Sequence, residues 1–220
     1  MTITTPIHPD ARKDKWIDRC VDVQIDGRKA VGKDGSGAFV IVLANHKGGV
    51  TKTTSTANLA AMLAEAGRRV LIVDCDPQAN LSEAFGWYAD IPGERLEDLL
   101  ENPDAADRYA PPLALQPDVV PELPWRERLR IIPSTDALAD VAADLPTTAG
   151  PGHELRLRQV LEPLRDSFDL ILLDTPPGLG TLSGIAVLAA DGLLIPALAL
   201  TSTCAAPASC MTSSRARFLG

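Results

Sequence analysis

The sequence predicts an α/β fold, with a mostly parallel sheet flanked by helices, and three apolar runs are the main support for it. They occupy residues 39–44, 70–73 and 170–173; the first leads into a glycine-containing loop, and the other two end at an aspartate. Segments with helical character separate them. Strands that alternate with helices favour right-handed crossovers and therefore a parallel sheet.

The first apolar run, residues 39–44, is predicted to be a buried strand, and the Ala- and Leu-rich residues 55–67 are predicted to be a helix closed by glycine. The segment between them reads Lys47-Gly48-Gly49-Val50-Thr51-Lys52-Thr53-Thr54. A strand, a glycine loop and a helix in this order are the context of a phosphate-binding loop. Glycine lets the backbone approach an anion, and the amides at the helix start point toward it.

Two side chains of this loop suit a nucleotide. Lys52 can reach the terminal phosphates, and the Thr53 hydroxyl can ligate magnesium. The loop departs from the general pattern, because His46 and Thr51 stand where that pattern has its two glycines. A β-branched residue resists positive φ, so we expect Thr51 to strain or reshape the loop, at more cost to hydrolysis than to binding. The alternative is a glycine-containing turn with chance lysines.

The second run, residues 70–73, leads into two aspartates at alternate positions, Asp74 and Asp76, followed by Pro77. Alternate residues of a strand share a face, so both carboxylates can look toward the phosphate site where the strand ends. Pro77 then interrupts the ladder. The alternative is a buried strand capped by acidic turn residues.

The third run, residues 170–173, ends at Asp174 and continues as Thr-Pro-Pro-Gly. Four apolar residues before an aspartate are the usual form of a Walker B strand, whose carboxylate can hold magnesium through water. A buried strand with an acidic end is again the alternative. The three motifs occur in the expected order, each after an apolar run, which favours a nucleotide site over three coincidences.

These motifs resemble the ParA/MinD family of ATPases, which has a deviant Walker loop, over about residues 39–197. Lys47 stands where the family has its extra lysine. Asp76-Pro77-Gln78-x-Asn80 resembles the partitioning branch, ParA, more than MinD or the nitrogenase iron protein. Softer similarities cover residues 130–135 and 181–196. The cysteines lack the pattern that an iron–sulfur cluster would need; they are Cys20, Cys75, Cys204 and Cys210.

The resemblance implies a P-loop NTPase fold that binds ATP and Mg²⁺. Lys52 would contact the β- and γ-phosphates, and Thr54 would bond the α-phosphate. Magnesium would be held by Thr53 and, through water, by Asp174, with Asp74 supporting the metal shell or the extra lysine. The implied nucleotide-binding residues are Gly48, Gly49, Val50, Thr51, Lys52, Thr53 and Thr54.

The resemblance also implies catalytic roles for Lys47 and Asp76 beside Lys52. Asp76 would position or activate the attacking water. Lys47 would reach across an ATP-dependent homodimer to the partner's phosphates, as an arginine finger does. Hydrolysis would release the dimer and switch its affinity for DNA. Members of the family are slow ATPases that DNA and a ParB-type partner stimulate.

Composition limits the partners. The net charge is −8, and residues 39–200 alone carry twelve basic and 23 acidic residues, which argues against a large basic surface for non-specific DNA. Apolar runs are too short for a membrane span, and residues 1–10 lack a signal peptide's apolar centre. The chain does not end in a basic amphipathic helix, which disfavours MinD-like membrane cycling. Four scattered cysteines indicate reduced thiols and a cytoplasmic protein.

Three regions are expected: an N-terminal arm and linker at 1–38, the ATPase domain at 39–200, and an atypical tail at 201–220. The tail lacks strand or helix periodicity. This loss of pattern near Leu198 leads to the hypothesis that the chain is truncated, by a frameshift or a gene-model error. If the chain contacts DNA, the candidate residues are the N-terminal lysines, Arg215 and Arg217, although scattered basic residues are only a weak indication.

Two other functions stay open. The first is an inactive, truncated nucleotide-binding remnant with the same fold. The second is a small-molecule ligase or kinase on the same scaffold, similar to dethiobiotin synthetase. Lys47 and the Asp74/Asp76 pair favour the partitioning ATPase over the ligase.

Overall fold

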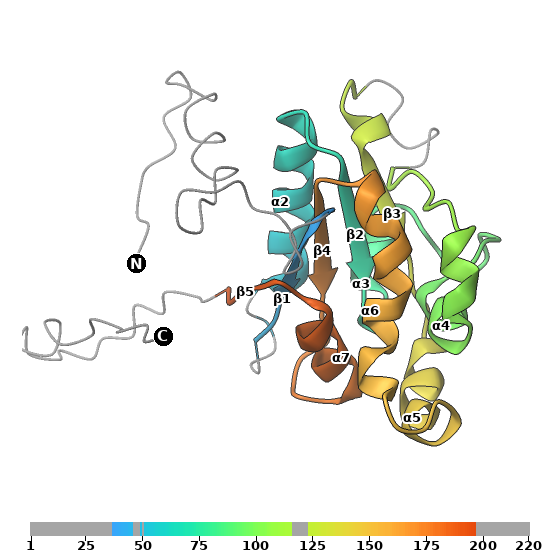
Figure 1. Ribbon diagram of the computed structural model, residues 1–220. Coiled ribbons are helices and arrows are strands. Elements are labelled where there is room, and N and C mark those ends of the chain that lie inside the picture. Colours follow the sequence, from blue (N-terminus) through green and yellow to red (C-terminus); the bar gives the residue numbers. More distant parts are fainter. Residues whose placement is uncertain (1–36, 46–48, 50, 116–122, 197–220) are drawn as a thin grey trace, which may run out of the picture.

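The computed structural model describes residues 37–45, 49, 51–115 and 123–196. These residues form a five-stranded sheet in the order β3-β2-β4-β1-β5, and every neighbouring pair is parallel, as predicted. Helices lie on both sides of the sheet (Figure 1). The tail predicted at 201–220 and nearly all of the predicted arm lie outside the described residues. The strands are β1 (Phe39–Leu43), β2 (Val70–Asp74), β3 (Leu129–Ile132), β4 (Leu170–Asp174) and β5 (Gly192–Leu194).

The α-helices are α2 (Lys52–Glu65), α3 (Asn80–Ala84), α4 (Leu96–Glu101), α5 (Leu138–Thr148), α6 (Arg156–Leu161) and α7 (Thr181–Ala189). Short 3₁₀ turns occupy Pro103–Asp107, Arg126–Arg128, His153–Leu155 and Glu162–Ser167. None of the helices in the described part of the chain is long and apolar enough to cross a membrane.

Two helices differ from the sequence-based expectation. Helix α2 begins at Lys52, three residues before the predicted start, so the lysine and threonines of the glycine loop belong to its first turn. The amphipathic segment predicted over 154–165 is divided into α6 and the 3₁₀ turns on either side. Pro163 explains the early end of α6, because proline has no main-chain N–H to continue the helix.

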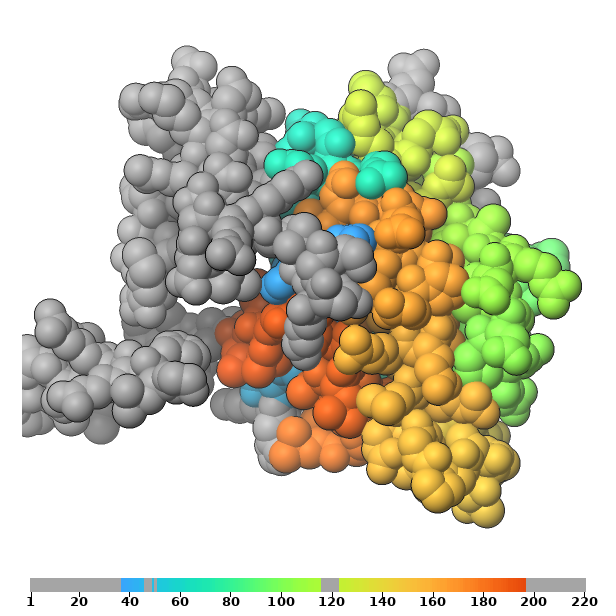
Figure 2. Space-filling view, viewed as in Figure 1, coloured from blue at the N-terminus to red at the C-terminus, as the bar shows by residue number. Residues whose placement is uncertain are grey.

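The three central strands, β1, β2 and β4, are almost wholly buried, as the continuous apolar runs predict for parallel strands, whereas the edge strand β5 is partly exposed. All five residues of β2 are buried. One apolar cluster lies between the sheet and helices α4 to α7, and a second lies between the sheet and helices α2 and α3. Figure 2 shows α5, α6 and α7 covering one side of the molecule. The register sets Asp74 and Leu43 beside Asp174, so the three central strands end at one edge.

A buried ion pair ties the start of β1 to the strand at the sheet edge. Arg165 Nη1 donates to Asp191 Oδ2 at 3.0 Å and to the Ala38 carbonyl at 2.9 Å. The same Asp191 oxygen accepts the Val40 N–H at 2.9 Å. The chain passes so close here that a Cβ on Gly37, at φ +67°, would lie 2.7 Å from Arg165 Cβ. These contacts link the amino ends of β1 and β5, at the edge of the sheet opposite the site.

Candidate nucleotide-binding site

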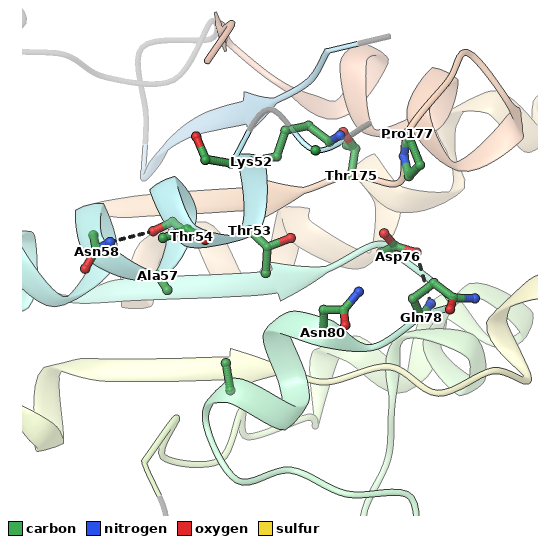
Figure 3. Close-up of a pocket in the computed structure, with 13 residues that line it drawn as sticks. Lys52, Thr53, Thr54, Ala57, Asn58, Asp76, Gln78, Asn80, Thr175 and Pro177 are labelled. Atoms are coloured by element: carbon green, nitrogen blue, oxygen red, sulfur yellow. Dashed lines mark hydrogen bonds between the residues drawn. The ribbon is translucent and has the colours of Figure 1, made fainter. Parts of the chain in front are cut away.

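A cavity of about 640 Å³ opens at the carboxyl edge of the sheet, beside the start of α2. This is the edge at which open α/β sheets bind ligands, and the volume is in the range of small-molecule pockets. The loops after β2 and β4 form its other walls (Figure 3). Its lining residues are Gly49, Thr51, Lys52, Thr53, Thr54, Ala57, Asn58, Asp76, Gln78, Asn80, Ala84, Thr175 and Pro177.

The glycine loop reaches the helix through left-handed backbone. Gly49 has φ +71°, which suits glycine, but Thr51 also has a positive φ of +61°. The expectation of strain at Thr51 therefore agrees with the conformation observed. No side chain among the described residues caps the start of α2, so its first amides are available to an anion in the cavity. Lys47, Gly48 and Val50 lie outside the described residues, and their roles stay predictions.

Replacing Thr51 with glycine is expected to raise the free energy of unfolding by about 1 kcal/mol. The left-handed conformation costs a non-glycine residue roughly 1–3 kcal/mol, and the extra freedom of glycine in the unfolded chain offsets part of the gain. Urea unfolding measures the change. Thr54→Gly is the matched control, because Thr54 is an exposed threonine in α2, where glycine should instead lower stability by about 0.4 kcal/mol. A loss at Thr51 as large as the loss at Thr54 would refute the strain.

Lys52 is the one described lysine, and it is directed along the cavity. Its side chain extends toward Thr175, and the residue is 7% exposed. The Thr175 hydroxyl donates to the Leu43 carbonyl at 2.7 Å, which ties the loop after β4 to the end of β1. Thr53 and Thr54 line the same cavity from the first turn of α2. The structure thus brings the described part of the predicted loop together around one space.

Asp174 is fully buried at the base of the site. Its Oδ1 accepts the Thr56 hydroxyl at 3.0 Å, whereas its Oδ2 has no hydrogen-bond partner among the described residues. Burial raises the pKa of Asp174 to about 6, although the Thr53 and Thr56 hydroxyls lower it in part. A buried oxygen that lacks a partner beside a threonine hydroxyl fits a magnesium site completed by water and phosphate oxygens. The described residues contain no group of three or more acidic, His or Cys side chains that could hold a metal alone.

The two alternate aspartates occupy different environments. Asp76 lines the cavity and its Oδ1 accepts the Gln78 N–H at 3.0 Å (Figure 3). Asp74 does not line the cavity. Its Oδ2 accepts both the N–H and the hydroxyl of Ser82, at 2.8 and 2.7 Å. Strand alternation would direct both toward the phosphates, but Asp76 lies beyond the last residue of β2, and Ser82 binds the Asp74 carboxylate instead.

The stability of the metal-free protein is expected to fall as pH rises from about 4 to about 7. Burial raises the pKa of Asp74 from 3.8 to about 7, and hydrogen bonds from Ser82 lower it only in part. In that window the folded chain holds a proton that the unfolded chain has released, so the free energy of unfolding decreases with pH.

Asp74→Asn should make this slope shallower, because amide and protonated acid are both neutral. Urea unfolding of both proteins in EDTA across the window is the measurement. Equal slopes would show that Asp74 is already ionised in the folded state near pH 4.

Sequence reasoning missed three hydroxyls that organise the site: those of Thr56, Ser82 and Ser134. Thr56 lies one helical turn after Lys52, a spacing that a helical projection could have revealed once the start of α2 was known. Ser82 and Ser134 come from α3 and from the loop after β3. Their partners lie 8 and 58 residues away, and no local pattern shows such pairs.

Comparisons with known proteins place this site in a family. A protein-family model described as an AAA domain matches residues 38–204. The chain is 36% identical over 158 residues to the sporulation initiation inhibitor protein Soj of Bacillus subtilis. It is 39% identical over 158 residues to the chromosome partitioning protein ParA of Myxococcus xanthus. The chain belongs to the ParA-like family of AAA-domain ATPases. The predicted resemblance is thereby confirmed.

The match with these ParA-like relatives is partial in length. It covers 71% of this chain, but only 57% of Soj and 51% of ParA. The chain therefore spans little more than half the length of the curated relatives it matches. The activities and partners of the full-length relatives are therefore proposals for this chain.

Two solved structures share the fold of this ParA-like chain. Cobyrinic acid a,c-diamide synthase from Mycobacterium smegmatis, with bound ATP analog and magnesium, superposes with a TM-score of 0.61 at 33% identity. The superposition covers 72% of this chain and 59% of the synthase. The Cyanothece McdA(D38A)–ATP complex gives a TM-score of 0.61 at 30% identity, over 74% of this chain and 57% of its own. These neighbours confirm the P-loop NTPase fold class.

Proposed function

We propose that the chain binds MgATP in the cavity, hydrolyses it slowly, and uses the nucleotide state to control association with a second copy. One observation carries the proposal. Lys52, Thr53 and Asp76 line a single cavity, and the Oδ2 of Asp174, which has no hydrogen-bond partner within the described part of the chain, is buried beneath it. These are the groups that phosphoryl transfer requires: a cation on the phosphates, oxygen ligands, and a carboxylate for water.

Each group has a defined task in this proposal. The first amides of α2 and the Lys52 ammonium bind the phosphates. Thr53 and Asp174 hold magnesium, Asp174 through water, and the bound ion supplies positive charge beside the β- and γ-phosphates. Asp76 holds the attacking water, because its carboxylate faces the cavity while its backbone is fixed. Asp74 acts indirectly, through Ser82 and the loop that carries Asp76.

The partners are proposed from family membership. The chain would form an ATP-dependent homodimer in the bacterial cytoplasm or on the nucleoid. It would respond to a ParB-type protein and to non-specific DNA, although the acidic residues 39–200 make a large DNA surface on this part unfavourable. In this dimer, Lys47 would reach across the interface to contact the phosphates bound by the partner and so complete the partner's site.

A small-molecule ligase is the second candidate, because one structural neighbour is a cobyrinic acid a,c-diamide synthase. The relatives in the partitioning class are 36% and 39% identical, whereas that synthase is 33% identical. The run from Asp76 to Asn80 also favours partitioning. A ligase would need a carboxylate acceptor for turnover and no ATP-dependent dimer.

Sedimentation in MgATP and in MgADP distinguishes these functions. We expect monomer with MgADP and dimer with MgATP, and we expect Asp76→Ala to prolong the dimer because it blocks hydrolysis. Lys52→Ala is the control that should remain monomeric in both nucleotides. A chain that binds MgATP yet stays monomeric, and releases phosphate only with a small acceptor, would support the ligase. A folded chain that binds no nucleotide would be a remnant.

A further inference from the structure

The loop after β3 lies against the loop that carries Asp76, where the ladder between β2 and β3 has ended. That ladder pairs Val73 with Ile132 and goes no further. Beyond it, the link is Ser134, which is 1% exposed. Its hydroxyl donates to the Asp76 carbonyl at 3.0 Å. A side-chain hydrogen bond thus continues the connection between the two strands up to the cavity.

Ser134 belongs to a closed set of buried hydrogen bonds. Its N–H donates to Ser82 Oγ at 3.0 Å, and Ser82 Oγ donates to Asp74 Oδ2 at 2.7 Å. The other Asp74 oxygen accepts the Asp76 N–H at 3.1 Å. The direction of the Ser134 hydroxyl is fixed, because its partner is the Asp76 carbonyl, which can only accept. The set therefore defines one arrangement of the Asp76 backbone.

The turn after Asp76, whose carbonyl Ser134 binds, has a strained backbone. Asp76 is followed by a tight turn in which the Ala79 N–H donates to the Asp76 carbonyl at 2.9 Å. Ala79 then enters α3 with φ +51°, the second of the two described non-glycine residues with positive φ. A left-handed alanine persists only where its surroundings enforce it. The hydroxyl of Ser134 supplies that constraint at the carbonyl on which the turn closes.

We infer that Ser134 is a positioning residue for ATP hydrolysis, which fixes the Asp76 carboxylate through the Asp76 carbonyl and does not touch the nucleotide. The expected change in kcat rests on the proposed function, ATP hydrolysis at this site. Removing the hydroxyl should leave the phosphate-binding groups of α2 in place, since the hydroxyl bonds to the Asp76 carbonyl and not to α2. It should instead loosen the turn and displace the carboxylate from the attacking water, and a displacement of about 1 Å can cost on the order of 100-fold in rate.

Ser134→Ala tests this inference, with Ser183→Ala as the matched control. Ser183 is 3% exposed, and its hydroxyl has no hydrogen-bond partner among the described residues. For Ser134→Ala we expect kcat to fall by about 10-fold or more, with the Kd for MgATP changed less than about 2-fold. Ser183→Ala should change neither. Ser134→Thr, which keeps the hydroxyl, should recover most of kcat.

Hydrogen exchange supplies a readout that is independent of turnover. The amides of Gln78 and Ala79 should exchange faster in Ser134→Ala than in wild type. In Ser183→Ala their exchange rates should equal those of wild type. If Ser134→Ala does not fold, Ser134→Cys replaces it, since sulfur is a weak donor of similar size and should give the same pattern.

Three results would overturn the inference: an unchanged kcat, an equal loss of kcat and MgATP affinity, or unchanged exchange at Gln78 and Ala79. A wild-type chain without ATP turnover would refute the proposed function alone. In that case the exchange comparison still decides whether Ser134 holds the Asp76 turn.

Discussion

Replacing Lys52 with alanine is expected to weaken MgATP binding by roughly 12- to 150-fold, or about 1.5–3 kcal/mol, the range for a hydrogen bond to a charged group. Lys52 lines the cavity and the residue is only 7% exposed, so water screens its attraction for a phosphate less than it would at the surface. No other described lysine is available to replace it. Isothermal titration calorimetry with a non-hydrolysable ATP analogue measures the change.

Arg68→Ala is the control for the loss of one positive charge. Arg68 lies beyond the far end of α2 and does not line the cavity, so its removal should change the affinity less than about 2-fold. Both variants should keep the wild-type far-ultraviolet spectrum. Equal affinity of Lys52→Ala and wild type would mean that phosphates bind elsewhere.

The largest loss of stability is expected from Asp191→Ala, at about 3–5 kcal/mol, the cost of removing one partner of a buried ion pair. Among the described residues, Arg165 would keep only the Ala38 carbonyl and the half-exposed Glu162, 3.4 Å from its Nε, as acceptors. The side chains of Arg165 and Asp191 are 5% and 1% exposed. Alanine would also remove the acceptor of the Val40 N–H. Because the whole free energy of unfolding of a domain is only about 5–15 kcal/mol, this change should remove a large part of it.

Arg69→Ala is the matched control for an exposed ion pair. Arg69 and Asp169 also form a bond of 2.9 Å, but their side chains are 53% and 33% exposed. Solvent screening limits such a pair to about 1 kcal/mol or less. Urea unfolding of the two variants under the same conditions gives the comparison. Similar losses for both would show that burial does not decide the strength of the Arg165–Asp191 contact.

The fold and the place of the site were predictable because their signals are local. Each central strand is a continuous apolar run, and the motif residues follow directly at its carboxyl end, as at Asp174. Parallel strands bring such ends to one edge without further information. The backbone strain at Thr51 was also predictable, since the residue type alone conflicts with the conformation that the loop needs.

The environment of the carboxylates was not predictable in the same way. Strand alternation treats Asp74 and Asp76 alike, yet only Asp76 reaches the cavity. The difference arises because Ser82 donates to the Asp74 carboxylate, whereas Ser134, from another element of the fold, binds the Asp76 main-chain carbonyl and not its carboxylate. Periodicity describes which side of a strand a residue faces. It cannot describe which donors the tertiary structure brings to that side.

The central claim is that these residues form a working ATPase site, and phosphate release from MgATP tests it most directly. We expect slow release that requires magnesium and falls about 100-fold or to background in Asp76→Ala, as for the loss of a catalytic base. MgATP binding by Asp76→Ala should persist. Wild-type protein that binds MgATP but releases no phosphate above background, or release that Asp76→Ala leaves unchanged, would contradict the account.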